Sequence, residues 1–294
     1  MTTQNIAYIY PDQNWKYMRL LLLLALAGAS LVFSGCERDD DDSTTAIVIT
    51  PEGNLLIEPG DTLQLDASES VNWSATAGII DGNGMYIAPG EQGKFIVTAT
   101  SKNDPARSAE RIVLVTYHAE LFKTMRNGGY VIYFRHANAT VGIDNFNSTI
   151  PEWWKSCDST IARQLSTEGR QQATETGAAF KNIGLPFSKI MSSEFCRCIQ
   201  TAQRFDVKPE LPIETSQSLT YTVYGDENGR YQRTLDLING LPAGNGVVLL
   251  TAHSFPTGSP GPLLQMGDAA IYKQQPNGAE LAAIVTVADW VALE

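Results

Sequence analysis

The chain has 294 residues, which is enough for two domains, and 43% of them are hydrophobic, as in ordinary globular proteins. The formal net charge of −11 argues against nucleic-acid binding, which requires a basic surface. Part of the negative charge is local, because Asp39–Asp42 form an acidic run of the kind that stays solvated.

Residues 1–35 have the pattern of a targeting segment. A basic start at Met18-Arg19 precedes an apolar stretch at 20–33, which is shorter than the ~20 residues that span a membrane. A basic start, an apolar core and small residues before a cleavage site are typical of a signal peptide, and Met18 is a candidate for the true start. Ser34-Gly35-Cys36 resembles the lipobox of a bacterial lipoprotein.

The lipobox resemblance implies cleavage before Cys36 and lipidation of that cysteine. Residues 36–45 would then form an acidic tether, similar to the tracts that send some lipoproteins to the outer cell surface. We therefore expect an outer-membrane lipoprotein that is held by its lipid anchor and faces outward. A plain secretory signal with a chance cysteine is the alternative.

Residues 46–117 carry an all-β pattern. Short runs that alternate apolar and polar residues, as at 95–99, are separated by glycine and proline turns. This spacing predicts a sandwich with Trp73 as a core residue. The stretches 78–89 and 93–99 resemble bacterial Ig-like domains of surface proteins. Such a domain is either a ligand-binding module or a spacer, and we favour the spacer.

From residue 118 the pattern changes to α/β. The predicted helices cover 119–126, 196–205 and a stretch capped by Ser166 or Thr167 that extends to 182. The predicted strands cover 130–134, 190–193 and 247–251, and 280–287 fits a strand or a helix. The polar connection at 138–163 is long, and long connections are often functional.

The most informative residues lie where predicted strands end. Arg135 and His136 follow the first strand, and His253 follows the strand at 247–251. Arg197 lies in the first turn of a predicted helix. Ligands of open α/β sheets bind at the carboxyl ends of strands. Neutral histidine is a nucleophile near pH 7 and arginine binds phosphate, so this set favours chemistry on a phosphoryl group.

Four stretches in this order resemble motifs of the histidine phosphatase superfamily, also called phosphoglycerate mutase-like. They are Phe134–Ala137, Leu165–Ala173, Ser192–Ala202 and Leu249–His253. The resemblance covers effectively the whole of the second domain, 118–294. It implies a three-layer α/β fold behind an all-β Ig-like sandwich.

The resemblance also implies a role for each residue of the set. His136 would attack phosphorus and form a phosphohistidine, which water then hydrolyses. Arg135 and Arg197 would hold the phosphoryl oxygens, and His253 would donate to the transferring group. Such a scheme needs no metal and no cofactor, because positioning and cationic side chains do the work.

Two departures from the family pattern bear on the activity. Ala139 and Gly142 stand where the mutase-type pattern has Ser and Asn, so we do not expect mutase activity. Most active members also need a carboxylic acid to protonate the leaving oxygen, and no Glu of this chain aligns with that position. Asp226 and Glu227 are placed best for that role by chain order, with Glu214 behind them.

Three cysteines remain after Cys36. In an exported protein they allow one disulfide and one free thiol. We predict that Cys157 pairs with Cys196 or Cys198. A zinc site is disfavoured because Cys-x-Cys is not a usual zinc spacing.

The sequence thus predicts a surface-anchored phosphatase that hydrolyses phosphate monoesters through His136. Its substrate would be a phosphorylated small molecule or glycan, its membrane contact would be the lipid anchor, and nucleic acid would not be a partner. The alternative is a non-catalytic cell-surface protein that binds phosphorylated or anionic ligands.

Overall fold

The computed structural model describes residues 46–224, 229–242 and 244–294. The predicted signal peptide, the lipidation site at Cys36 and the tether lie outside these residues, and so do Asp226 and Glu227. Residues 45–294 form one compact unit. Each helix within the described ranges is too short or too polar to cross a membrane.

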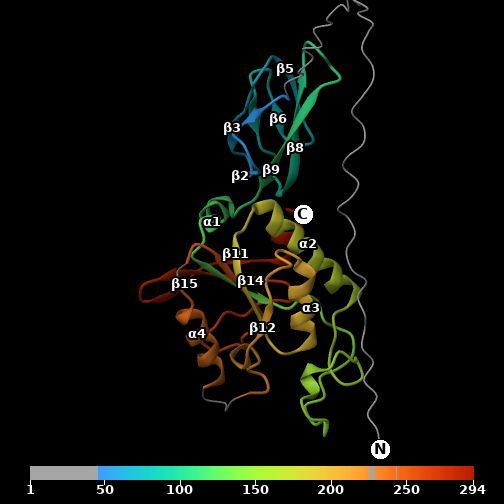
Figure 1. Ribbon diagram of the computed structural model, residues 1–294, viewed down its shortest axis with the longest axis vertical. Coiled ribbons are helices and arrows are strands. Elements are labelled where there is room, and N and C mark those ends of the chain that lie inside the picture. Colours follow the sequence, from blue (N-terminus) through green and yellow to red (C-terminus); the bar gives the residue numbers. More distant parts are fainter. Residues whose placement is uncertain (1–45, 225–228, 243) are drawn as a thin grey trace, which may run out of the picture. The chain divides into compact units, whose positions relative to one another are not determined.

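The N-terminal part of the described chain is rich in β-strands and forms three small sheets (Figure 1). One has the order β2 (Leu55–Ile57), β9 (Ser108–Val115), β8 (Gly93–Ser101) and β5 (Val71–Ala75). The others join β3 (Thr62–Gln64), β7 (Met85–Ile87) and β6 (Ile79–Ile80), and β1 (Ile49–Thr50) with β4 (Asp66–Ala67). The predicted β-rich character is confirmed, while the Ig-like sandwich and the domain border at 117 stay predictions.

Tyr86 is the largest fully buried side chain of this β-rich region. Its hydroxyl group donates to the carbonyl of Ala77 at 2.9 Å, and Leu65 belongs to the same core. Trp73, the expected core residue, packs against this core from β5 and is partly buried. The aromatic ring of Tyr86, with its satisfied hydroxyl group, fills the centre.

A six-stranded sheet forms the middle of the C-terminal part. Its order is β12 (Ile213–Thr215), β11 (Phe187–Ser192), β13 (Val247–Ala252), β10 (Tyr130–Arg135), β14 (Ala269–Gln275) and β15 (Gly278–Val285). The first four strands of this order are parallel, and β14 and β15 are antiparallel to their neighbours. The strands predicted at 130–134 and 247–251 lie within β10 and β13, and the one predicted at 190–193 overlaps the end of β11.

Five helices cover the sheet, and the first three of them begin and end close to the predicted positions. They are α1 (Ala119–Met125), α2 (Thr167–Ile183), α3 (Cys196–Phe205), α4 (Arg230–Gly240) and α5 (Val287–Val291), with single turns η1 (Trp153–Lys155) and η2 (Gln217–Leu219). Ser166 caps α2 by accepting the N–H of Gly169 at 2.9 Å, and Gly184 ends it with a φ of 79°. The segment 280–287, predicted as a strand or a helix, is mainly strand, because β15 runs to Val285 and α5 begins at Val287.

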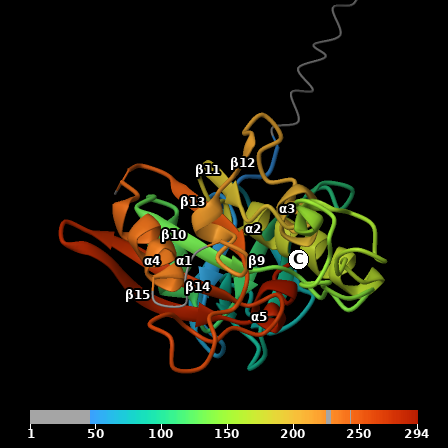
Figure 2. The same ribbon diagram turned by 90° about the horizontal axis from the view of Figure 1, so that it is seen from below.

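Helices cover both faces of the sheet (Figures 1 and 2), and a hydrophobic core lies on each face. Successive side chains of a strand point to opposite faces. Ile132 and Phe134 accordingly join the core formed with α1, α2, α3 and α5, whereas Val131 and Tyr133 join the core formed with α4. The sheet is thus the middle of three layers, and the predicted α/β class is confirmed.

Trp290 of α5 closes the first of these cores. It is fully buried, its ring stacks on Phe122 at 5.2 Å between centroids, and it meets Phe180 edge-on at 5.0 Å. Its indole N–H has no hydrogen-bond partner among the described residues. The ring therefore stabilises the fold by packing and not by its polar atom.

We expect Trp290→Ala to lower the free energy of unfolding by about 3–5 kcal/mol, because it leaves a large cavity in the core. Trp290→Phe should lose less than half as much, since it keeps an aromatic ring and removes an unpaired N–H. Urea unfolding followed by circular dichroism measures both values. Equal losses for the two variants would contradict the assignment to aromatic packing.

Candidate active site

Three neighbouring strands end at one edge of the sheet, and each is followed by a polar residue. β10, β13 and β11 are paired up to their last residues. His136, His253 and Ser193 directly follow them. The N–H of His136 donates to Ala252 at 3.0 Å and the N–H of Ser193 donates to Thr251 at 2.8 Å, so the ladder continues past the strand ends. The two histidines are brought together in this way.

His136 is buried and its ring orientation is fixed. Its Nδ1 lies 2.9 Å from the carbonyl oxygen of Ala137, a contact that requires a proton on Nδ1. The lone pair is then on Nε2, which accepts a hydrogen bond from Nε of Arg197 at 3.2 Å. The tautomer inferred from these contacts presents Nε2 as a nucleophile to the space beside Arg197.

His253 is held by a chain of hydroxyl groups. Its Nε2 lies 3.1 Å from Oγ of Ser193, which donates to Oγ1 of Thr220 at 3.3 Å, and Thr220 donates to the carbonyl of Ser216 at 2.8 Å. This order places a proton on Nε2 and leaves Nδ1 as an acceptor, 3.5 Å from Nη2 of Arg197. The two imidazole rings lie 5.6 Å apart, nearly perpendicular.

Burial, and next the charge of Arg197, lowers the pKa of both His136 and His253 well below the usual 6.5. The charges of Arg163 and Arg135 act in the same direction. Both histidines are therefore neutral near pH 7 in the free protein. A neutral His136 is the protonation state that a nucleophilic role requires.

The two predicted arginines differ in their surroundings. Arg197, the second residue of α3, is 2% exposed and contacts both histidines. Arg135 ends β10 and donates from Nη1 to the carbonyl of Leu264 at 2.6 Å. The buried Nε of Arg135 has no partner within the described residues. Arg135 thus keeps one N–H donor without a partner in the described part of the chain.

Sequence reasoning missed two residues of the 138–163 connection, Asp144 and Arg163. The carboxylate of Asp144 binds Arg197 through both oxygens, at 2.9 and 3.1 Å. Arg163 lies 3.7 Å from the same carboxylate through Nη2, and its carbonyl lies 3.4 Å from Nη1 of Arg197. The only signal for them in the sequence was the length of the connection.

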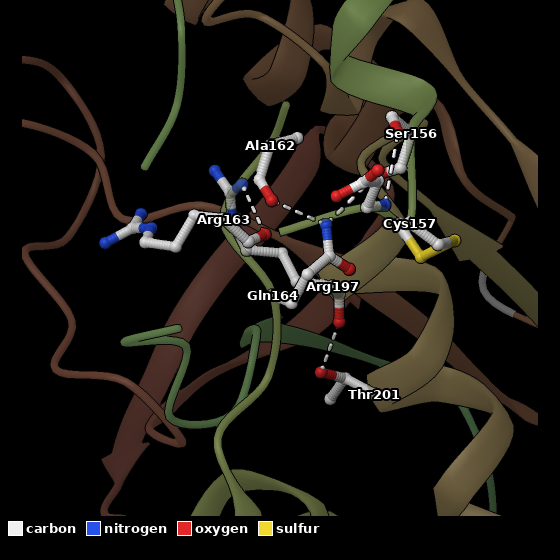
Figure 3. The surroundings of a disulfide bond; sticks show 9 residues. Ser156, Cys157, Ala162, Arg163, Gln164, Arg197 and Thr201 are labelled. Atoms are coloured by element: carbon white, nitrogen blue, oxygen red, sulfur yellow. Dashed lines mark hydrogen bonds between the residues drawn. A yellow bond between two sulfur atoms is a disulfide. The ribbon is translucent and has the colours of Figure 1, made fainter. Parts of the chain in front are cut away.

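A disulfide ties this connection to the helix that carries Arg197. Cys157 is bonded to Cys196, the residue before Arg197, with 5.4 Å between their Cα atoms (Figure 3). Beside it, Gln164 donates to the carbonyls of Ser156 and Ala162. Cys198 stays a buried free thiol, and burial raises its pKa to about 12, so it is not a thiolate at neutral pH.

The described carboxylates around the site already have partners. Glu194 accepts hydrogen bonds from Trp154 at 2.9 Å and Tyr224 at 2.8 Å. Asp268 accepts two backbone N–H groups, and Glu214 forms an ion pair with Lys189 at 2.9 Å. The predicted donors Asp226 and Glu227 lie outside the described residues, so their role stays a prediction.

Within the described ranges, His, Cys, Asp and Glu side chains do not gather in groups of three or more that could hold a metal ion. The polar groups that do gather are three arginines and two neutral histidines, with one carboxylate bound to Arg197. Such a set suits an oxyanion such as a phosphoryl group.

Residues 153–239 match the family model of the histidine phosphatase superfamily (branch 1). That stretch contains Arg197, whereas His136 and His253 lie on either side of it. A comparison with curated proteins finds no match.

Three solved structures illustrate what the chain is similar to. One is the protein histidine phosphatase SixA complexed with tungstate: 19% identity, 54% of this chain, 97% of that chain, TM-score 0.38. A second is phosphoserine phosphatase from Entamoeba histolytica with phosphoserine: 14% identity, coverage 54% and 97%, TM-score 0.33. A third is a mycobacterial glucosyl-3-phosphoglycerate phosphatase: 14% identity, coverage 53% and 98%, TM-score 0.37.

We expect the stability of the protein to fall as the pH drops from 7 to 5. The unfolded chain takes up protons on His136 and His253 near pH 6.5, and the folded protein takes them up only at a lower pH. The slope is at most about 2.7 kcal/mol per pH unit for two histidines, at 1.36 kcal/mol each. Urea unfolding at several pH values measures it. The double variant His136→Gln, His253→Gln should show a flatter dependence, and an unchanged slope would contradict the pKa assignment.

Proposed function

We propose that this chain, whose C-terminal part is a histidine phosphatase superfamily (branch 1) domain and thus a phosphomonoesterase, works through a phosphohistidine on His136. The observation that carries the proposal is the contact between Nε2 of His136 and Nε of Arg197 at 3.2 Å. It aims the lone pair of a neutral histidine at a cation that can hold the phosphoryl group.

The reaction would proceed in two displacements at phosphorus. Nε2 of His136 attacks, and an N–P bond forms as the P–O bond to the leaving alcohol breaks. Water then attacks phosphorus, the N–P bond breaks, and inorganic phosphate leaves. Arg197 and the unpartnered Nε of Arg135 supply donors to the phosphoryl oxygens, where negative charge develops.

His253 would change its protonation state when substrate binds. In the free protein its Nδ1 accepts from Arg197, so the ring has no proton to offer on that side. A phosphate dianion beside the ring raises its pKa, because an opposite charge favours the protonated form. The second proton on Nδ1 would then donate to a phosphoryl oxygen.

The leaving group sets the range of substrates. An alkoxide must gain a proton, and Asp226 and Glu227 are the donors that we propose for it. Without such a donor the site would act on good leaving groups, such as phosphohistidine or activated esters. We propose a phosphorylated small molecule or glycan as the substrate.

Purified residues 45–294, the compact unit that contains the site, should release phosphate from p-nitrophenyl phosphate. His136→Ala should reduce kcat by at least about 10³-fold, since it removes the nucleophile. His118→Ala is the matched control, because His118 contacts Asp289 and not the site, and it should leave turnover unchanged.

Unchanged turnover in the His136→Ala variant, with circular dichroism as for wild type, would overturn the mechanism. Binding of inorganic phosphate without turnover on a broad panel of esters would instead favour a non-catalytic protein that binds phosphorylated or anionic ligands.

We also propose that the chain is a lipoprotein anchored through Cys36 at the outer cell surface, with residues 46–117 as an Ig-like spacer. The support is the order of a basic start, an apolar stretch, Ser34-Gly35-Cys36 and the acidic run at 39–42. A disulfide between Cys157 and Cys196 suits such an oxidising location.

In a bacterial host that lipidates exported proteins, the full chain should sediment with membranes, and Cys36→Ser should move it to the soluble fraction. The control Cys198→Ala changes a cysteine inside the folded part and should stay with the membranes. Membrane association of the Cys36→Ser variant equal to that of wild type would rule out the lipid anchor.

A further inference from the structure

Every N–H of Arg197 faces an acceptor in the structure. A guanidinium has five N–H donors. Nε donates to His136 at 3.2 Å, and Nη2 lies 3.5 Å from Nδ1 of His253 and 3.1 Å from Oδ2 of Asp144. Nη1 lies 2.9 Å from Oδ1 of Asp144 and 3.4 Å from the carbonyl of Arg163. A phosphoryl group can bind Arg197 only by replacing some of these acceptors.

The two edges of the planar guanidinium have different partners. The edge formed by Nε and Nη2 faces the two histidines, which are neutral acceptors at the longer distances. The edge formed by Nη1 and Nη2 faces the carboxylate of Asp144, with shorter, charge-assisted bonds. An anion that enters between the histidines would therefore replace the weaker contacts and leave the Asp144 pair in place.

Asp144 is itself held in place. Its Oδ1 accepts the backbone N–H of Arg163 at 3.1 Å, and its side chain is 12% exposed. The connection that carries it is pinned by the bridge between Val141 and Gln164 and by the disulfide next to Arg197. A carboxylate fixed in this way can define the position of a long, flexible arginine side chain.

Asp144 also neutralises the buried charge of Arg197 in the free protein. Arg197 is 2% exposed, and a buried cation without a counter-charge is strongly unfavourable. The neutral histidines do not supply one. Asp144 does, and it leaves the phosphate-facing edge of Arg197 open to exchange.

We infer that Asp144 is a positioning residue for catalysis: it holds the Arg197 guanidinium so that its Nε and Nη2 edge faces the phosphoryl group between His136 and His253. The inference rests on the proposed function of this site. It assigns Asp144 to the binding of substrate through Arg197, and not to proton transfer.

The test compares Asp144→Asn with wild type in the full chain, by turnover of p-nitrophenyl phosphate and by calorimetric binding of inorganic phosphate. We expect kcat/KM to fall and the Kd for phosphate to rise, each about 10- to 100-fold, as for the loss of a charge-assisted contact. Asp144→Glu restores the carboxylate and should recover part of both. Asp158→Asn, an exposed position in the same connection, should change neither.

A double-mutant cycle separates positioning from a purely structural role. In an Arg197→Ala background, Asp144→Asn should change the Kd for phosphate by less than about twofold, because its partner is gone. An equal loss in both backgrounds overturns the inference, as does an unchanged Kd in the single variant. Tighter phosphate binding by Asp144→Asn also overturns it, since Asp144 would then compete with substrate.

Phosphate binding keeps this test separate from the proposed function. If wild type binds phosphate and shows no turnover, the phosphatase mechanism fails, and the shift in Kd still decides the role of Asp144. If wild type turns over the ester and the Asp144 variants behave as wild type, the mechanism stands and the positioning role fails. If Asp144→Asn does not fold, the cycle is run with Asp144→Glu. That variant should weaken phosphate binding relative to wild type when Arg197 is present, and should leave the Kd unchanged in the Arg197→Ala background.

Discussion

A buried guanidinium is the constraint on which the rest of this site depends. Arg197 is almost fully enclosed, and a cation in that position persists only when its donors are satisfied and its charge is countered. One edge of the guanidinium faces His136 and His253, which follow strands of the sheet. The other edge faces Asp144, which belongs to the 138–163 connection. Strands, helix α3 and the connection must therefore all be in place before the site exists.

The same cation sets the protonation of its neighbours. Burial and the charge of Arg197 keep His136 and His253 neutral, so the group that would bind phosphate also keeps the nucleophile ready. The hydroxyl chain from Ser193 through Thr220 fixes which nitrogen of His253 carries its proton. Under the proposed mechanism, a bound phosphate dianion would raise the pKa of His253, and substrate binding would then be coupled to proton uptake.

Much of the fold followed from local patterns in the chain. The buried strands β10 and β13 and the capped helix α2 were predictable because their apolar periods and end signals are strong. β14, the edge strand β12 and helix α4 were missed. β12 has three residues, and α4 begins without a side-chain cap, so its apolar face is recognised only against the second core. Trp73 packs against its core and is only partly buried, and local sequence does not distinguish such a side chain from one inside the core.

The sequence by itself indicated which residues could bind or attack a phosphoryl group, since Arg135, His136, Arg197 and His253 lie at the ends of predicted strands or in the first turn of a predicted helix. It also narrowed the disulfide to Cys157 with one of two neighbours. Only the tertiary structure paired Cys157 with Cys196 and brought Asp144 and Arg163 against Arg197. Those contacts join residues as many as 53 positions apart through an irregular connection that has no periodicity to read, so they depend on how the whole chain folds.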